Sequence, residues 1–158
     1  MTARPTAEKT AAAFRQRTAV TCAIRATPER IWSLLTNAAD FPRWNSTVTS
    51  VEGTIALGQP LKIRVPIAPG RVFKPKVTAF EPGRSMVWSD GLPPMFRGVR
   101  TFTLQPDAGG STTFSMAEEL SGVMLPLIRG SLPDFGPAFE AYAADLKREA
   151  ERVGSANG

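Results

Sequence analysis

The sequence of 158 residues contains no histidine and a single cysteine, Cys22. These absences exclude an intrachain disulfide, a zinc site built from cysteine and histidine ligands, and any mechanism that depends on a histidine base. The GxGxxG, GxxxxGKS/T, HExxH and paired CxxC motifs are also missing, so nothing supports a dinucleotide site, a P-loop or structural zinc. We therefore predict neither a metal nor a cofactor.

Long apolar runs are absent as well. No stretch approaches the ~20 apolar residues of a membrane-spanning helix, and the N-terminal residues lack the apolar segment of a signal peptide, so we expect a cytoplasmic protein. The content of 42% hydrophobic and 21% charged residues is typical of one globular domain. We place this domain at residues 17–153, between a flexible basic tail (residues 1–16) and a flexible C-terminal tail (residues 154–158).

The net charge of +5 is distributed unevenly. Residues 1–17 contribute +3 and residues 60–100 contribute +6, whereas residues 101–158 carry −4. Basic residues at alternating positions of strands are typical of a solvated sheet face, and a nucleic-acid site would normally add aromatic stacking partners. We therefore predict no nucleic-acid partner, and weak association with an anionic membrane stays open.

Hydrophobic periodicity predicts the first elements. Apolar residues at every second position from Val20 to Ala26 are typical of a half-buried strand, with Cys22 on its buried face. Thr27 is suited to cap a helix, which we expect over residues 28–36. A second helical turn or tight loop follows at residues 37–45.

Glycine and proline turn signals then separate six further predicted strands, at residues 47–54, 60–67, 72–81, 84–90, 95–106 and 111–121. The short connections predict an antiparallel meander. From Phe135 to Val153, apolar residues recur at steps of three and four, which predicts a long amphipathic helix over about 134–153. The concave side of the sheet is the only large surface available to bury its aromatic face.

Four segments carry a resemblance to a known superfamily: Pro28-Glu29-Arg30-Ile31-Trp32, Asp40-Phe41-Pro42-Arg43-Trp44-Asn45, Val51-Glu52-Gly53 and the charged run Lys147–Glu151. With the order of elements, they resemble the SRPBCC superfamily of START-related, Bet v 1-like and polyketide cyclase/dehydrase domains, over residues 20–152. The resemblance implies an α+β helix-grip fold. In it, a curved antiparallel sheet, here of seven strands, wraps around the long C-terminal helix, with two short helices after the first strand and an apolar cavity between sheet and helix.

The turn before residue 111 sets the register of the last two strands. Pairing positions that sum to 218 places Phe102 opposite Met116 and Arg100 opposite Glu118, all on one apolar face. Arg100 and Glu118 would then be charges on the cavity side, where isolated ions are costly and paired ions are tolerated. Three alternatives are open. The two side chains form an ion pair at the sheet edge, a one-residue slip of the strand register returns both to solvent, or they anchor a carbonyl or carboxylate of an apolar ligand. In the last case, burial could also raise the pKa of Glu118 enough for proton transfer.

Two aromatic residues each allow two interpretations. Trp88 is either a cavity wall or a core residue, and Tyr142, the only tyrosine, is either a donor in the pocket or a core residue with its hydroxyl satisfied at the rim. The loops that contain Pro66–Gly70, Asp90–Met95 and Gly122–Ile128 are candidates for a mobile rim. The candidate ligand-binding residues are Trp88, Met95, Arg100, Phe102, Met116, Glu118, Phe135, Phe139 and Tyr142.

Two functions follow from this pocket. The favoured hypothesis is binding or transport of a small hydrophobic ligand, such as a lipid, a polyketide-like aromatic or a quinone. The alternative is a cyclase or dehydratase that acts on an apolar polyketide-like substrate, with Arg100, Glu118 and Tyr142 as candidate catalytic groups. The sequence does not decide between a carrier and an enzyme, and it predicts no oligomeric state.

Overall fold

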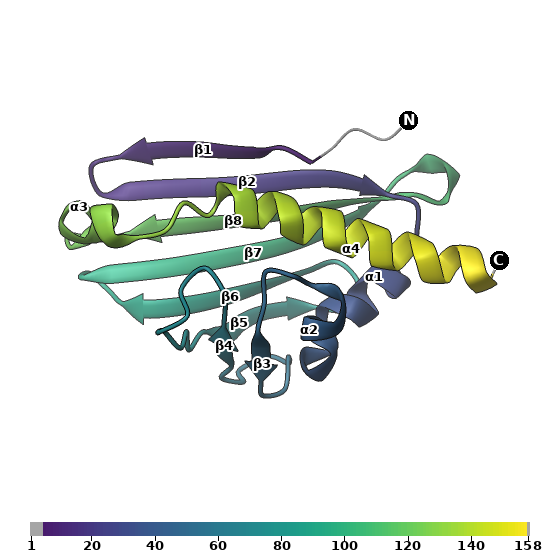
Figure 1. The fold of residues 1–158 in the computed structure, drawn as a ribbon, viewed down its shortest axis with the longest axis horizontal. Helices are drawn as coiled ribbons and strands as arrows, with labels where there is room; N and C mark the ends of the chain where they lie inside the picture. The colour runs from purple at the N-terminus through teal and green to yellow at the C-terminus, as the bar shows by residue number, and fades with distance from the viewer. Residues whose placement is uncertain (1–4, 158) are drawn as a thin grey trace.

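The computed structural model describes residues 5–157, with side chains through Arg152 (Figure 1). Its main antiparallel sheet consists of β1 (Ala7–Ala12), β2 (Arg15–Ile24), β5 (Lys76–Glu81), β6 (Ser85–Leu92), β7 (Phe96–Pro106) and β8 (Thr112–Ser121). Their spatial order is β1-β2-β8-β7-β6-β5. A second sheet pairs β3 (Ser50–Glu52) with β4 (Lys62–Arg64). This is an α+β fold.

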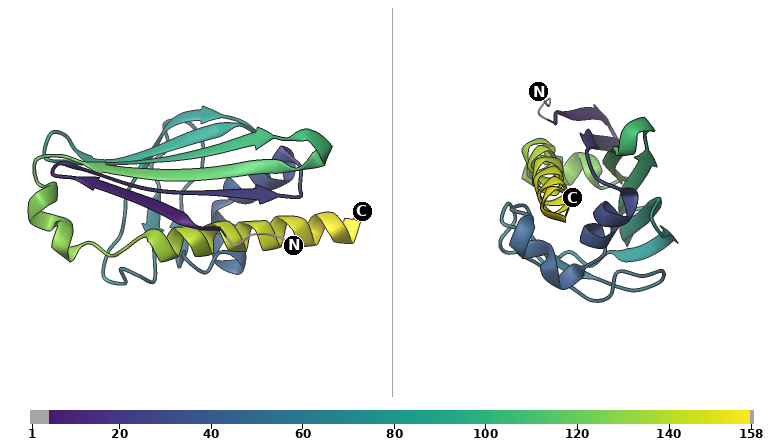
Figure 2. Two further views of the ribbon diagram at one scale, coloured as in Figure 1. Left: turned by 90° about the horizontal axis from the view of Figure 1, so that it is seen from above. Right: turned by 90° about the vertical axis from the view of Figure 1, so that its right-hand side faces the viewer.

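The remaining elements are helical: α1 (Pro28–Leu35), η1 (Ala38–Asp40), α2 (Phe41–Trp44), η2 (Ala108–Gly110), α3 (Leu125–Ile128), η3 (Arg129–Ser131) and α4 (Gly136–Asn157). The main sheet curves around α4, and the β3–β4 sheet lies on the same side of it as α4 (Figures 1 and 2). No helix in the part of the chain that the structure describes is both long and apolar enough to cross a membrane.

Local sequence accounts for the first half of the fold. Along β2, buried and exposed residues alternate, and Cys22 is buried as predicted. The Thr27 hydroxyl accepts a hydrogen bond from the Arg30 N–H at 3.2 Å, which caps α1. At the start of α4, the Asp134 carboxylate accepts a hydrogen bond from the Gly136 N–H at 3.0 Å.

The register of β7 and β8 is confirmed. Phe102 pairs with Met116 and Arg100 with Glu118, so the pairs sum to 218 as predicted. Phe102 and Met116 are fully buried between this part of the sheet and α4, and they form the centre of the core. Because side chains alternate along each strand, Arg100 and Glu118 are on the same concave face.

The prediction of a seven-stranded sheet is wrong, because the main sheet has six strands. Residues 47–54 and 60–67 form only the three-residue strands β3 and β4, which pair with each other. Pro60, Pro66 and Pro69 lie in and just after this region and provide no backbone N–H for a ladder, which favours short strands. Isolated bridges from Pro60 and Ile63 connect it to the segment at the start of β5.

The flexible tail predicted at residues 1–16 is wrong for its second half, because residues 7–12 form β1 and β2 begins at Arg15. The first four residues lie outside the described part of the chain. Most side chains of β1 are exposed, so the strand has no apolar alternation to detect, and it is held by backbone pairing with β2. At the other end, α4 continues to Asn157 through most of the predicted C-terminal tail, and Gly158 is not described.

Candidate functional site

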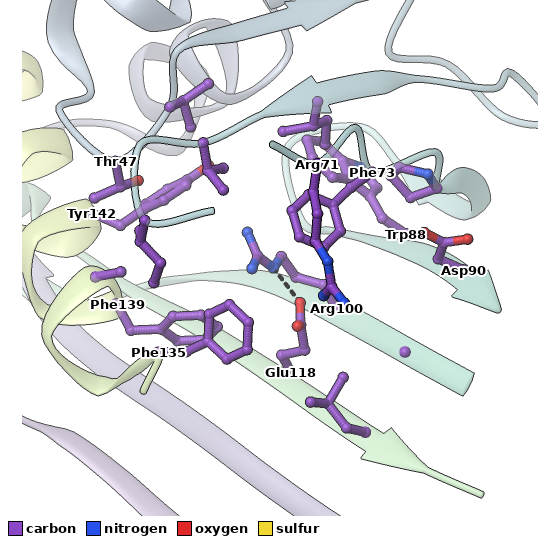
Figure 3. A pocket seen from close by; sticks show the side chains of 18 of the residues that line it. Thr47, Arg71, Phe73, Trp88, Asp90, Arg100, Glu118, Phe135, Phe139 and Tyr142 are labelled. Carbon is purple, nitrogen blue, oxygen red and sulfur yellow. Dashed lines mark hydrogen bonds and ion pairs between the residues drawn. The ribbon is translucent and has the colours of Figure 1, made fainter. Parts of the chain in front are cut away.

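A cavity of about 300 Å³ lies between the concave face of the main sheet, the first half of α4 and the segment from Thr47 to Pro75 (Figure 3). Aromatic and aliphatic side chains make up most of its lining. Tyr142 lies at one end of the cavity and Asp90 at the other, with Arg100 and Glu118 between them. Because Tyr142 is buried and Asp90 is exposed, these are the inner and the outer end.

A row of side chains crosses three neighbouring strands in the middle of the cavity. Trp88 of β6 pairs with Arg100 of β7, which pairs with Glu118 of β8. The Arg100 Nε–H donates to Glu118 Oε1 at 2.8 Å, and the two side chains are 23% and 18% exposed. The guanidinium carbon also lies 5.0 Å from the centroid of the Phe139 ring. The two charges therefore form an ion pair inside the cavity, and the one-residue slip does not occur.

Part of the space for a ligand exists because Gly98 has no side chain. Gly98 lies in the next row outward, between Asp90 of β6 and Leu120 of β8. A Cβ atom placed on Gly98 would have one neighbour within 4 Å, the Leu120 Cδ2 atom at 3.4 Å. The position is therefore open toward the cavity, and a larger residue there would fill it.

Tyr142 is surrounded by aromatic rings on α4's buried face. The ring centroids of Phe41, Trp44, Phe102 and Phe114 lie 6.1–6.4 Å from its own. Its hydroxyl is buried and has no hydrogen-bonding partner among residues 5–157. Burial raises the pKa of this phenol far above its ordinary value, and the positive charge of Arg100 offsets only part of that effect. The phenol is thus neutral at physiological pH and available as a donor.

Trp88 has a comparable unpaired donor. Its ring packs 4.8 Å from that of Phe102, and the residue is 4% exposed. The indole Nε1–H is buried and has no partner within the described residues. Trp88 is therefore both a cavity wall and a core residue.

The structure brings six of the nine candidate residues to the cavity: Trp88, Arg100, Glu118, Phe135, Phe139 and Tyr142. It places Phe102 and Met116 one row deeper, where both are 0% exposed, because the rings of Trp88 and Tyr142 pack over that row. Met95 is 44% exposed in the turn between β6 and β7, and it does not line the cavity either. Phe102, Met116 and Met95 therefore lie near the cavity without lining it.

One wall of the cavity was not foreseen. The segment between α2 and β5 contributes Thr47, Val48, Val51, Ile63, Val65, Ile67, Arg71, Phe73 and Pro75. The apolar alternation at Ile63, Val65 and Ile67 was a detectable signal, but it predicts a strand and does not specify the surface that the strand faces. No group of three or more potential metal ligands occurs among the residues described.

Two of the three loops predicted as a rim, Asp90–Met95 and Gly122–Ile128, meet at one end of the molecule, together with the hairpin between β1 and β2. The third loop, Pro66–Gly70, contributes Ile67 to the cavity lining. The backbone N–H of Gly122 donates to the Phe14 carbonyl at 3.1 Å, and that of Met124 donates to the Met95 carbonyl at 2.9 Å. Four side chains here are strongly exposed: Phe14, Leu92, Val123 and Leu127. We call this set the apolar end.

Over residues 15–153, the sequence matches the family described as polyketide cyclase / dehydrase and lipid transport. Since the match covers most of the chain, the protein belongs to this family. The resemblance stated from the sequence is thereby confirmed. The sequence has no significant match among curated proteins.

Solved structures share the fold at low sequence identity. The Zhui aromatase/cyclase from Streptomyces sp. R1128 has 14% identity and a TM-score of 0.70, with 91% of this chain and 98% of that chain covered. Norcoclaurine synthase from Thalictrum flavum has 15% identity and a TM-score of 0.66 (92% and 99% covered). A START superfamily protein from Mycobacterium smegmatis has 18% identity and a TM-score of 0.64 (87% and 98% covered). At these identities the similarity establishes the fold.

Proposed function

We propose that this protein binds and carries a small hydrophobic ligand, such as a lipid, a polyketide-like aromatic or a quinone, in the cavity between sheet and α4. The observation that carries the proposal is the cavity itself, which is about 300 Å³ in volume and lined mainly by apolar side chains with a few polar groups. Apolar walls with few, well-placed polar groups are typical of small-molecule sites.

The chemistry of the polar groups favours binding over catalysis. Arg100 and Glu118 form an ion pair, so Glu118 Oε1 already accepts a hydrogen bond from the Arg100 Nε–H. The raised pKa of Tyr142 makes its phenol a weak acid at neutral pH. Binding requires only that these groups orient a ligand, which they can do in their present states.

Catalysis remains the second candidate, because Arg100, Glu118 and Tyr142 line the same cavity. A cyclase or dehydratase acting on an apolar polyketide-like substrate would use them as electrophile, base and acid. Loss of turnover in Glu118→Gln, with ligand affinity retained, would favour the enzyme over the carrier.

The proposal is tested with the neutral dye N-phenyl-1-naphthylamine, whose fluorescence rises in apolar surroundings. We expect the wild-type protein to bind it, and Gly98→Leu to weaken binding by about tenfold or more, because the new side chain occupies the cavity. The matched control is Val99→Leu, since Val99 is the next residue of β7 and is on the opposite face of the sheet. Circular dichroism checks that both variants fold.

Two outcomes would overturn the proposal. One is the absence of any fluorescence increase with the wild-type protein. The other is equal affinity in the wild type and Gly98→Leu, which would place the dye elsewhere.

A further inference from the structure

Two residues of the cavity lining carry donors that have no acceptor. Tyr142 and Trp88 line the cavity, and neither the Tyr142 hydroxyl nor the Trp88 Nε1–H makes a hydrogen bond within residues 5–157. Both residues are more than nine-tenths buried. Leaving buried polar groups unpaired costs free energy, so such groups require an explanation. The other buried unpaired atoms of the described chain, on Arg30, Trp44, Asn45 and Arg129, do not belong to residues that line this cavity.

A third donor lies next to them. Arg100 is the cross-strand partner of Trp88, and it lines the same cavity as Trp88 and Tyr142. Only the Nε–H of Arg100 takes part in the hydrogen bond to Glu118. Within the described residues, no hydrogen bond is recorded for its two terminal amino groups, which are therefore available to a ligand.

Free acceptors are fewer than free donors in this cavity. Arg100 donates to Oε1 of Glu118, and the Oε2 atom is the one carboxylate oxygen of this pair without a donor within the described residues. Asp90 lies at the outer end, where its two oxygens accept from the backbone N–H groups of Gly91 and Lys74 (Figure 3). The polar groups that face the buried end of a bound molecule are thus predominantly donors.

The donor types restrict the ligand. An indole N–H and a guanidinium can only donate, whereas a phenol can donate or accept. A carbonyl or carboxylate oxygen offers lone pairs to all three and introduces no new proton that needs an acceptor. A hydroxyl would introduce such a proton, and a hydrocarbon would leave every donor unpaired.

We propose that the cavity selects apolar ligands whose buried end carries an acceptor oxygen, a carbonyl or a carboxylate, held by Tyr142, Trp88 and Arg100. This rests on the proposed function, because the ligand must first enter the cavity. It narrows the ligand class to ketones, quinones and carboxylic acids with an apolar skeleton.

The experiment compares two ligands that differ in one group. 1-Tetralone and tetralin share a bicyclic skeleton, and only the ketone has an acceptor; 1-naphthoate and naphthalene form the equivalent pair for a carboxylate. Affinities are measured by displacement of N-phenyl-1-naphthylamine. In the wild type, we expect at least one acceptor-bearing member to bind about tenfold more tightly than its hydrocarbon, the effect of one hydrogen bond to an otherwise unpaired group.

Variants then assign this preference to the donors. Tyr142→Phe and Trp88→Phe should each reduce this preference, the ratio of the affinity for the ketone or carboxylate to the affinity for its hydrocarbon, severalfold. Trp32→Phe is the matched control, because Trp32 packs on Phe80 and does not line the cavity. Since the hydroxyl of Tyr142 has no partner, Tyr142→Phe should not lower the unfolding temperature, which keeps the test valid even if Trp88→Phe is unstable.

The outcomes separate the two proposals. Equal affinities within both ligand pairs, or an undiminished preference in Tyr142→Phe, would overturn the inference and leave hydrophobic binding intact. Failure of the dye and of all four ligands to bind would overturn both proposals.

Discussion

At the residue scale, Tyr142 connects the core to the cavity. Its ring packs among Phe41, Trp44, Phe102 and Phe114, while its hydroxyl is the innermost unpaired donor of the site. Burial disfavours the charged form of the phenol and raises its pKa, because the phenolate would lose its hydration. The same burial therefore affects both ligand recognition and the response of the fold to alkaline pH.

We predict that Tyr142 does not ionise in the folded protein near its ordinary pKa of about 10. Below that pH, both the folded and the unfolded state keep the proton, so stability is unaffected. Above it, the unfolded state loses the proton and the folded state keeps it, so the free energy of unfolding falls as pH rises. Because Tyr142 is the only tyrosine, tyrosinate absorbance reports this residue alone.

The tyrosinate absorbance of the native protein should appear well above pH 10, together with loss of the circular dichroism signal. In denaturant, the same titration should have its midpoint at about pH 10. A reversible midpoint near 10 in the native protein would show that the phenol is accessible to water.

At the scale of elements, a charged cluster on α4 holds the two short helices. Glu149 is 6% exposed, and its carboxylate lies 2.8 Å from an Arg43 nitrogen of α2 and 3.6 Å from an Arg30 nitrogen of α1. Arg152, one turn along α4, also donates to it at 2.8 Å. Burial opposes ionisation of Glu149, but the hydrogen bonds from Arg43 and Arg152 outweigh it, so the pKa is lowered.

We predict that Glu149→Gln lowers the free energy of unfolding by about 1–3 kcal/mol at neutral pH, because three arginines lose a charged partner. A lowered pKa stabilises the folded state above the unfolded pKa of about 4.3, and this contribution is lost as pH falls through the folded pKa. The difference between the variant and the wild type should therefore shrink in acid. Urea unfolding across this pH range measures it.

The matched control is Glu81→Gln, since Glu81 is exposed and has no ion pair among the residues described. It should change stability by less than about 0.5 kcal/mol at any of these pH values. A Glu149→Gln difference that is independent of pH would contradict the charge-based explanation.

At the scale of the whole molecule, charge and apolar exposure combine. The net charge is +5, and the side chains of the apolar end, Phe14, Leu92, Val123 and Leu127, are between 54% and 76% exposed. Backbone hydrogen bonds tie the loops of this end together, so they present one surface. Basic charge and exposed apolar side chains are the two features that attract a protein to an anionic bilayer.

We predict weak binding to vesicles that contain phosphatidylserine at low salt, and loss of binding as the salt concentration rises, because screening removes the electrostatic attraction. Leu127→Glu should reduce the bound fraction in a sedimentation assay. Leu57→Glu is the control, since Leu57 is 62% exposed but lies outside the apolar end. Equal binding to neutral vesicles, or no effect of Leu127→Glu, would contradict the prediction.

Local sequence patterns determined a large part of the fold. Four features that depend only on neighbours in the chain were predicted correctly: the alternation in β2, the Thr27 cap, the amphipathic period of α4 and the turn before residue 111. The last of these placed Arg100 opposite Glu118. The pairing followed from the sequence because a short turn leaves two adjacent strands little freedom of register.

Contacts between distant segments decided the rest. Strand β1 exists because backbone groups of β2 were available at the sheet edge, and backbone pairing leaves no mark in the side-chain pattern. The segment from Thr47 to Pro75 became a cavity wall only when its short strands paired with each other. The unpaired donors of Trp88 and Tyr142 likewise emerge only in three dimensions, because whether a polar group finds a partner depends on everything that packs around it.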